Sequence, residues 1–304
     1  MTKATGKLSA GLFALISGFL ISLQSRINSE LSIALESGIF AALISFGGGL
    51  CVISIITLGV SENRRKLQQA CQNFLDRRIP FALAFAGCIG GFFVIVQSSI
   101  AGIVGISLFS IGVVSGTALS ALFLDGLGLL GLQKRRINTR RVIGIVTAVA
   151  GLIVAGDFSN YSFNPVVFLA FLAGFGMGFQ HAMNGKFGQI LESGVVPTFF
   201  NFLTGVVFIS IALLLLDSGS IPSVFPTNPV LYLGGLVGVI FIFIQVLVLP
   251  RLGALAMGLA LLVGQLFGSL SLDLLVPIAD RQVNASTIIG ILLAIVGAGL
   301  VAKR

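Results

Sequence analysis

Long apolar segments follow one another along the whole chain, separated by short polar ones. We interpret ten of them as helices that cross a bilayer, for which roughly 20 largely apolar residues are needed. They are Leu8–Ile27, Gly38–Leu58, Ile79–Ser99, Gly102–Leu124, Val142–Ala155, Val166–Asn184, Gly194–Leu216, Val230–Leu249, Gly253–Leu272 and Ser286–Ala302. Their polarity does not alternate as it does in the strands of a membrane barrel. The pattern therefore predicts an all-α membrane protein with ten transmembrane helices.

Polar residues inside these segments recur at a fixed offset. Seven residues of the first half have an identical residue 156 positions later, in the pairs Gln24/Gln180, Asn28/Asn184, Glu36/Glu192, Ser37/Ser193, Gly38/Gly194, Phe46/Phe202 and Gly49/Gly205. With small deletions, the pairs Gln97/Gln245 and Asp125/Asp273 follow at 148, and Gly144/Gly290 and Gly151/Gly297 at 146. The chain thus divides into a first repeat, 1–157, and a second, 158–304. Since each repeat has five helices, an odd number, the second enters the membrane from the opposite side, as in the inverted repeats of secondary transporters.

Charge supports this topology. If the N-terminus is cytoplasmic, 16 of the 18 Lys and Arg residues fall on the cytoplasmic side, and only Arg26 and Arg281 fall outside. This distribution follows the positive-inside rule, so both termini are expected in the cytoplasm. Topology also accounts for the net charge of +8, and a nucleic-acid partner is not expected. With 56% hydrophobic and 9% charged residues, the expected surroundings are a lipid bilayer.

Two motifs connect the chain to a known family. Gly-x5-Gln-x3-Asn, followed by Glu-Ser-Gly and a Phe-x2-Gly helix, occurs in both halves ("ISFGGG", "NFLTG"). It resembles the YdcZ-type inner-membrane exporters of the drug/metabolite transporter (DMT, EamA-like) superfamily, in a fused form. The stretches that begin "ALFLDGLG" and "SLSLDLLV" are similar to the end-of-repeat pattern of that superfamily. The resemblance implies a ten-helix, multi-pass transporter of the bacterial inner membrane and no defined substrate.

The recurring amides are the main candidates for a substrate pathway. Gln24 and Asn28 are four residues apart and share one helix face, and the same holds for Gln180 and Asn184. An amide without a partner is costly in hydrocarbon, so these groups must face protein or water. We expect a polar stripe that lines a translocation pathway; the alternative is that the amides bond across helices and hold the halves together. The candidate pathway residues are Gln24, Asn28, Gln97, Gln180, His181, Asn184 and Gln245.

Four carboxylates form a second candidate set. Glu36 and Glu192 lie just before a helix start, where they either cap the helix or couple transport to protons. Asp125 and Asp273 end their helices and are expected to organise the turns. His181, the only histidine, replaces Ser25 of the first half and is either a titratable pathway group or a satisfied polar residue.

Function follows from these patterns together. We expect a secondary-active transporter that exports small polar or amphipathic metabolites by alternating access, with no cofactor and no metal. A polytopic enzyme is disfavoured because no catalytic or metal-ligating cluster lies within the spans. Two alternatives stay open: a membrane scaffold without transport, and a small-multidrug-like cation exporter. Because the first helix offers amides and no embedded Glu, neutral or zwitterionic substrates are expected. Either a monomer or a homodimer is compatible with the sequence.

Overall fold

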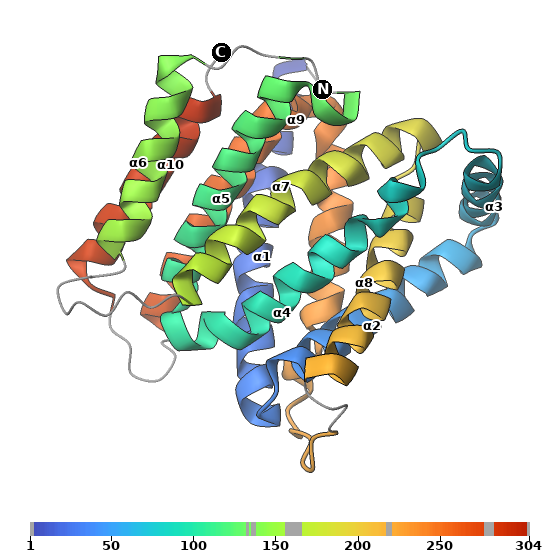
Figure 1. Cartoon of the computed structure of the whole chain (residues 1–304), viewed down its shortest axis with the longest axis horizontal. Helices are drawn as coiled ribbons and strands as arrows, with labels where there is room; N and C mark the ends of the chain where they lie inside the picture. The colour runs from blue at the N-terminus through green and yellow to red at the C-terminus, as the bar shows by residue number, and fades with distance from the viewer. Residues whose placement is uncertain are drawn as a thin grey trace.

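The computed structural model describes residues 3–131, 134, 138–155, 166–216, 221–276 and 283–302, which form helices with no strand among them (Figure 1). In chain order these are α1 (Lys3–Leu35), α2 (Gly38–Gly59), α3 (Ser61–Leu75), η1 (Phe81–Phe85), α4 (Ala86–Val104), α5 (Ile106–Leu127), η2 (Leu129–Gly131), α6 (Thr139–Ala155), α7 (Val166–Leu191), α8 (Val195–Leu216), η4 (Pro229–Tyr232), α9 (Gly234–Leu275) and α10 (Ala285–Ala302). The all-α prediction is confirmed for the described residues.

Seven helical segments within these residues are long and apolar enough to cross a membrane, by length and composition. They are Leu8–Leu35, Gly38–Gly59, Phe81–Val104, Ile106–Leu127, Val166–Leu191, Val195–Leu216 and Met257–Leu275. Two more apolar segments, Gly234–Gln245 and Ala285–Val301, are shorter, and α6 has 17 residues. The chain is therefore a multi-pass helical membrane protein, while the count of ten spans stays a prediction.

The helix α9 folds back on itself. It is assigned as one helix of 42 residues, although the sequence predicts two spans in this region. Ser17 Oγ donates to the Phe241 carbonyl at 3.1 Å, and Ser22 Oγ to the Gln265 carbonyl at 2.7 Å. Residues 241 and 265 would lie about 36 Å apart in a straight helix, whereas two residues five apart on α1 are separated by about 7.5 Å. We call residues 234–248 the first arm and 252–275 the second; Pro250, which has no N–H for the helix, lies between them.

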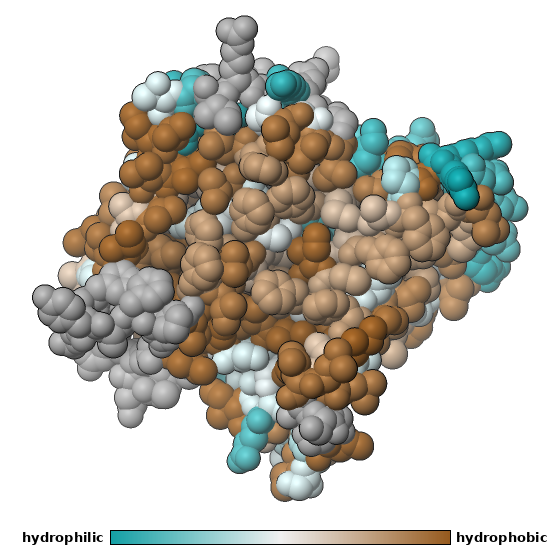
Figure 2. Space-filling model, in the orientation of Figure 1, coloured by the Kyte–Doolittle hydropathy of each residue, from teal (hydrophilic) through white to brown (hydrophobic). Residues whose placement is uncertain are grey.

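Apolar side chains cover much of the outer surface. Ile55, in α2, is 73% exposed, and Phe267, in the second arm of α9, is 66% exposed. Figure 2 shows hydrophobic residues over the middle of the face in view, with hydrophilic residues gathered at α3. A soluble monomer rarely exposes so much continuous apolar area, so this surface suits the acyl chains of a bilayer.

Small residues bring helices into close contact between the ends of the two halves. A Cβ atom at Gly144 in α6 would lie 2.7 Å from the Gly297 carbonyl oxygen in α10, and one at Gly151 would lie 2.6 Å from that of Gly290. Only glycine permits this separation, because a methyl group at any of these positions would overlap the facing backbone. Close backbone approach through small residues is the usual basis of helix association in membranes.

Each half sends a connecting segment onto the helix pair of the other half. The helix α3 packs Ala70 and Phe74 against Phe187 and Leu191 of α7 and Val196 of α8. At the far end of the molecule, Leu231 of η4 packs with Leu31, Leu35 and Ala41, which belong to α1 and α2. The ends of α1 and α10 near the two termini lie toward the same end of the molecule as α3 (Figure 1).

Candidate functional site

A cavity of about 510 Å³ lies among α1, α2, α4, α7, α8 and α9. Its polar lining residues are Gln24, Gln180, His181, Asn184, Gln189, Glu192, Ser193, Thr198, Asn201 and Gln245. Neither Lys nor Arg is among the described residues that line it. Glu192, at the turn between α7 and α8, is exposed, so the cavity reaches the surface at that turn.

Three amides from α7 and α8 meet on one wall. Asn201 Oδ1 accepts hydrogen bonds from Gln180 Nε2 at 2.8 Å and from Asn184 Nδ2 at 3.2 Å. Gln180 and Asn201 are 5% and 3% exposed, so these two side chains bond within the protein while they line the cavity. Asn184 Oδ1 is buried and accepts no hydrogen bond from the described residues.

Two further glutamines, Gln24 of the first half and Gln245 of the second, add to the polar lining. Gln24 Nε2 donates to the Gly234 carbonyl at 3.0 Å, which connects α1 to the start of α9. Gln245 Nε2 donates to Ser17 Oγ at 3.4 Å, also between α9 and α1. The structure thus brings five of the predicted pathway residues to one cavity: Gln24, Gln180, His181, Asn184 and Gln245.

The apolar part of the cavity contains a pair of phenylalanines from equivalent helices. The ring centroids of Phe46 and Phe202 are 5.0 Å apart with an interplanar angle of 50°. Each ring packs on a glycine of the opposite half, Phe202 on Gly49 and Phe46 on Gly205. The pair therefore joins α2 to α8 beside the amides and gives the cavity an aromatic wall.

Two predicted pathway residues lie outside the cavity lining. Asn28 Nδ2 donates to Gln97 Oε1 at 2.8 Å, and Gln97 Nε2 donates to Ser25 Oγ at 2.7 Å. Asn28 and Gln97 are both 0% exposed. In this structure they connect α1 to α4, which is the interhelical role that the sequence left as the alternative.

The glutamates of the two Glu-Ser-Gly motifs do not cap the helices that follow. Glu36 and Glu192 have φ values of 54° and 49°, in the left-handed region, and end α1 and α7. The capping oxygens belong to the next residue: Ser37 Oγ accepts from Phe40 N at 3.1 Å, and Ser193 Oγ from Val196 N at 3.5 Å. The expected capping role is therefore performed by the serines, while the Glu192 carbonyl accepts a hydrogen bond from Lys66 Nζ of α3.

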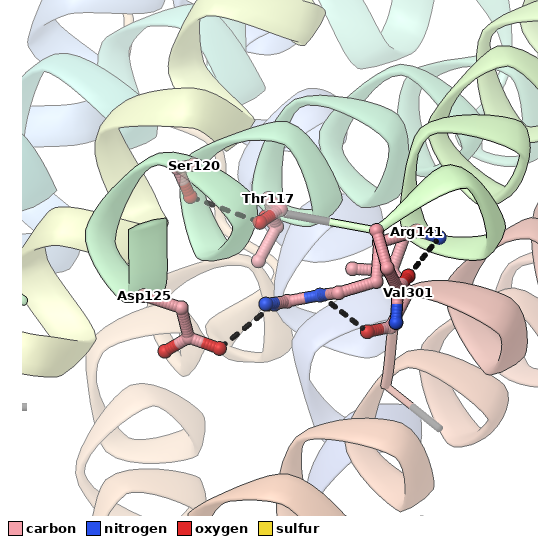
Figure 3. Close-up of polar contacts among 6 residues, drawn as sticks. Thr117, Ser120, Asp125, Arg141 and Val301 are labelled. Carbon is pink, nitrogen blue, oxygen red and sulfur yellow. Dashed lines mark hydrogen bonds and ion pairs between the residues drawn. The ribbon is translucent and has the colours of Figure 1, made fainter. Parts of the chain in front are cut away.

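Asp125 and Asp273, at the ends of the repeats, have different partners. Each of them bonds to a helix other than its own. Arg141 Nη2 donates to Asp125 Oδ2 at 2.7 Å, and Arg141 Nε donates to the Val301 carbonyl at 3.0 Å, so the guanidinium connects α5, α6 and α10 (Figure 3). Asp273 accepts from the backbone N–H groups of Ile106 and Ser107, at 3.1 and 2.7 Å. It therefore satisfies the first N–H groups of α5, where a helix dipole favours a carboxylate.

Asn201 lines the cavity but is not among the candidate residues drawn from the sequence. It has no identical residue in the first half, where Ser45 is at the equivalent position, so the search for repeated amides does not select it. A single amide in the middle of an apolar helix is the signal that was available.

Within the described residues, no group of three or more His, Cys, Asp or Glu side chains is placed to hold a metal ion.

Comparison with known proteins identifies relatives by sequence and by fold. A family model described as "Putative inner membrane exporter, YdcZ" matches residues 9–154 and again 165–300. No curated protein matches the chain. A solved structure titled "Crystal structure of protein" is similar to it with a TM-score of 0.55 and 18% identity, over 98% of this chain and 96% of that one. At that identity the likeness concerns the fold alone.

Proposed function

We propose that this chain, which belongs to the YdcZ family of inner-membrane exporters, is a secondary-active transporter of small polar or amphipathic molecules. The observation that carries the proposal is the cavity of about 510 Å³, lined by amides from both halves and by the Phe46/Phe202 pair. Polar groups in a membrane bundle are costly unless they bond to one another or serve a solute. Binding cavities of this size lie within the range for small molecules.

The mechanism we propose is alternating access between two inverted five-helix halves, 1–157 and 158–304. Reciprocal contacts between equivalent residues support it. Gln24 contacts Gly238 as Gln180 contacts Gly90, which stands at the equivalent position, and Phe46 and Phe202 exchange contacts with Gly205 and Gly49. Two halves that meet through the same contacts in both directions can exchange conformations, as in other transporters with inverted repeats. Ten spans with both termini in the cytoplasm complete this proposal.

The chemistry of the lining favours neutral or zwitterionic solutes. Glu192 is the one carboxylate among the described lining residues, and it is exposed at the mouth of the cavity. The other polar lining groups are amides, hydroxyls and His181. A permanent cation that leaves water needs an opposite charge close by, and an amide supplies only a dipole.

Flux measurements in proteoliposomes test this function. We expect the purified protein to move at least one neutral or zwitterionic solute from a panel of polar and amphipathic metabolites. Quaternary ammonium probes should cross the membrane no faster than in empty liposomes. A variant with Phe46→Ala and Phe202→Ala, which removes the aromatic wall, is the matched control for background leakage. Robust flux of quaternary ammonium ions would contradict the proposed substrate class, and no flux of any solute under any ion gradient would contradict transport.

A further inference from the structure

Equivalent amide pairs in the two halves are in different states. In the first half Asn28 of α1 and Gln97 of α4 share a hydrogen bond of 2.8 Å and exclude water completely. Their equivalents, Asn184 of α7 and Gln245 of α9, both line the cavity and bond elsewhere, to Asn201 and Ser17. The chain therefore contains the same pair of side chains twice, bonded once and separated once.

The helices that carry these pairs also differ in how closely they pack against each other. Among the described residues α1 packs along α4, while α7 and the first arm of α9 have no comparable contact. The cavity occupies the space between them, and its lining runs from Gln245 to Glu192. The contacts of Gln24 with Gly238 and of Gln180 with Gly90 still match between the halves. The two equivalent amide pairs therefore differ at the place where the cavity opens.

We propose that Asn28–Gln97 and Asn184–Gln245 are two alternating latches, of which one is bonded in each state of the transporter. Here the first latch is bonded and the cavity opens beside Glu192. In the opposite state α7 closes on the first arm of α9, Asn184 bonds to Gln245, and Asn28 separates from Gln97. This inference rests on the proposed function, because it concerns access to the same cavity.

The physical basis is that one amide–amide bond replaces another. Breaking a buried hydrogen bond in an apolar interior is costly unless water or another group takes its place. In the proposed exchange the opened pair faces the aqueous cavity and the closed pair forms a new bond. The two states then differ little in free energy, which a transporter needs if a solute is to shift the population between them.

Thiol labelling of two equivalent reporter positions tests the latches without a known substrate. The background is the full chain with Cys51, Cys71 and Cys88 replaced by alanine, reconstituted in liposomes. Gly185→Cys reports on the described cavity, where an added side chain meets no atom within 4 Å. Ser29→Cys is the equivalent position in the first half and is buried here. The measurement is the rate of reaction of each reporter with a membrane-impermeant maleimide.

The same substitution in the two latches should have opposite effects. We expect Gln97→Leu to slow labelling at the Gly185→Cys reporter and to speed it at the Ser29→Cys reporter, each by about fivefold. We expect Gln245→Leu to change both rates in the reverse direction. A substitution that only loosens the fold would speed both reporters in both variants, so opposite signs are specific to the latches.

Two outcomes would overturn the proposal: rates that change in the same direction in both variants, or rates that stay unchanged in variants with normal melting temperatures. If either leucine variant fails to fold, Gln97→Asn and Gln245→Asn shorten the side chain by one methylene, and the same opposite signs are expected. Opposite shifts together with a complete absence of flux would leave the latches in place and reject the transport function. Solute flux together with unchanged labelling rates would support the transport function and reject the latches.

Discussion

At the scale of single residues, Glu36 and Glu192 hold a backbone conformation that glycine usually adopts. Both end a helix at a left-handed position, with φ of 54° and 49°. Around Glu36 the hydrogen bonds Glu36 N to Ile33 O and Ser37 N to Ser32 O form a Schellman motif, and the same pattern surrounds Glu192. A residue with a Cβ atom pays a conformational cost of roughly 1 kcal/mol there. The sequence repeats this feature in both halves.

The first prediction concerns this strain. Glu36→Gly is expected to raise the melting temperature in detergent by roughly 2 °C, because the strained Cβ is lost while the hydrogen bonds of the motif remain. Glu36→Ala keeps the Cβ atom and is the matched control, with no increase expected. Equal melting temperatures for the glycine and alanine variants would show that the left-handed position is not strained.

The second prediction separates pathway residues from packing residues. Gln180→Leu removes a donor to Asn201 at the cavity wall. It is expected to lower stability by about 0.6 to 2 kcal/mol and to reduce solute flux about fivefold in the folded protein, since one bond near the solute is lost. Gln24→Leu, at the equivalent position in the cavity, is expected to act alike.

Gln265 offers the control for these variants. It is 3% exposed, lies outside the cavity lining, and its Nε2 has no partner among the described residues. Gln265→Leu is therefore expected to preserve both flux and melting temperature. If Gln180→Leu melts early but transports at the normal rate once folded, Gln180 is a packing residue and the site assignment is wrong.

At the scale of helices, one buried ion pair holds the end of the first half together. The side chains of Arg141 and Asp125 are 7% and 21% exposed, and Arg141 also reaches the Val301 carbonyl (Figure 3). The remaining guanidinium nitrogen, Nη1, is buried and has no partner among the described residues. A buried pair of this kind is sensitive to the loss of one member, because the other charge is then uncompensated.

The third prediction follows from that sensitivity. Asp125→Asn is expected to lower the free energy of unfolding by about 3 to 5 kcal/mol, measured by denaturation in detergent. Adding Arg141→Met removes the stranded charge, so the double variant is expected to recover much of the loss. The exposed pair of Asp76 and Arg78, with side chains 55% and 73% exposed, is the control, and Asp76→Asn should change stability by less than about 0.5 kcal/mol. Similar losses for the two single variants would contradict a special role for the buried pair.

At the scale of the whole molecule, charge and arrangement point to one topology. The basic helix α3 and the ends of α1 and α10 near the termini lie toward one end (Figure 1), and the cavity mouth at Glu192 is beside α3 through the Lys66 bond. Under the positive-inside rule we expect this end to face the cytoplasm. The described state would then be open to the cytoplasm, as an exporter that loads its solute needs to be.

The fourth prediction tests this orientation. A single cysteine introduced by Gln68→Cys on the exposed face of α3, in a chain without its native cysteines, should resist membrane-impermeant thiol reagents in intact cells and react after the membrane is permeabilised. A cysteine in place of exposed Val224, in the connection at the other end, should react in intact cells. Labelling with the opposite pattern would invert the topology.

The sequence by itself determined the lipid surroundings, the all-α fold class and much of the cavity lining. Apolar segments of helical length predict α2, α5 and α8 to within a few residues, because hydrocarbon requires continuous apolar faces and internal hydrogen bonds. Helix ends were predicted less well: α1 and α7 continue to Leu35 and Leu191, beyond the expected Ile27 and Asn184. Hydropathy marks where lipid ends, whereas a helix continues until its backbone is capped.

Only the tertiary structure decided which amides bond to each other and which face a cavity. The repeat makes Asn28 and Asn184 equivalent in sequence, yet one is buried against Gln97 and the other borders open space. Local sequence cannot distinguish them, because the difference depends on how far α1 lies from α4 and α7 from α9. Those distances are set by packing across the whole bundle, which no local stretch of sequence specifies.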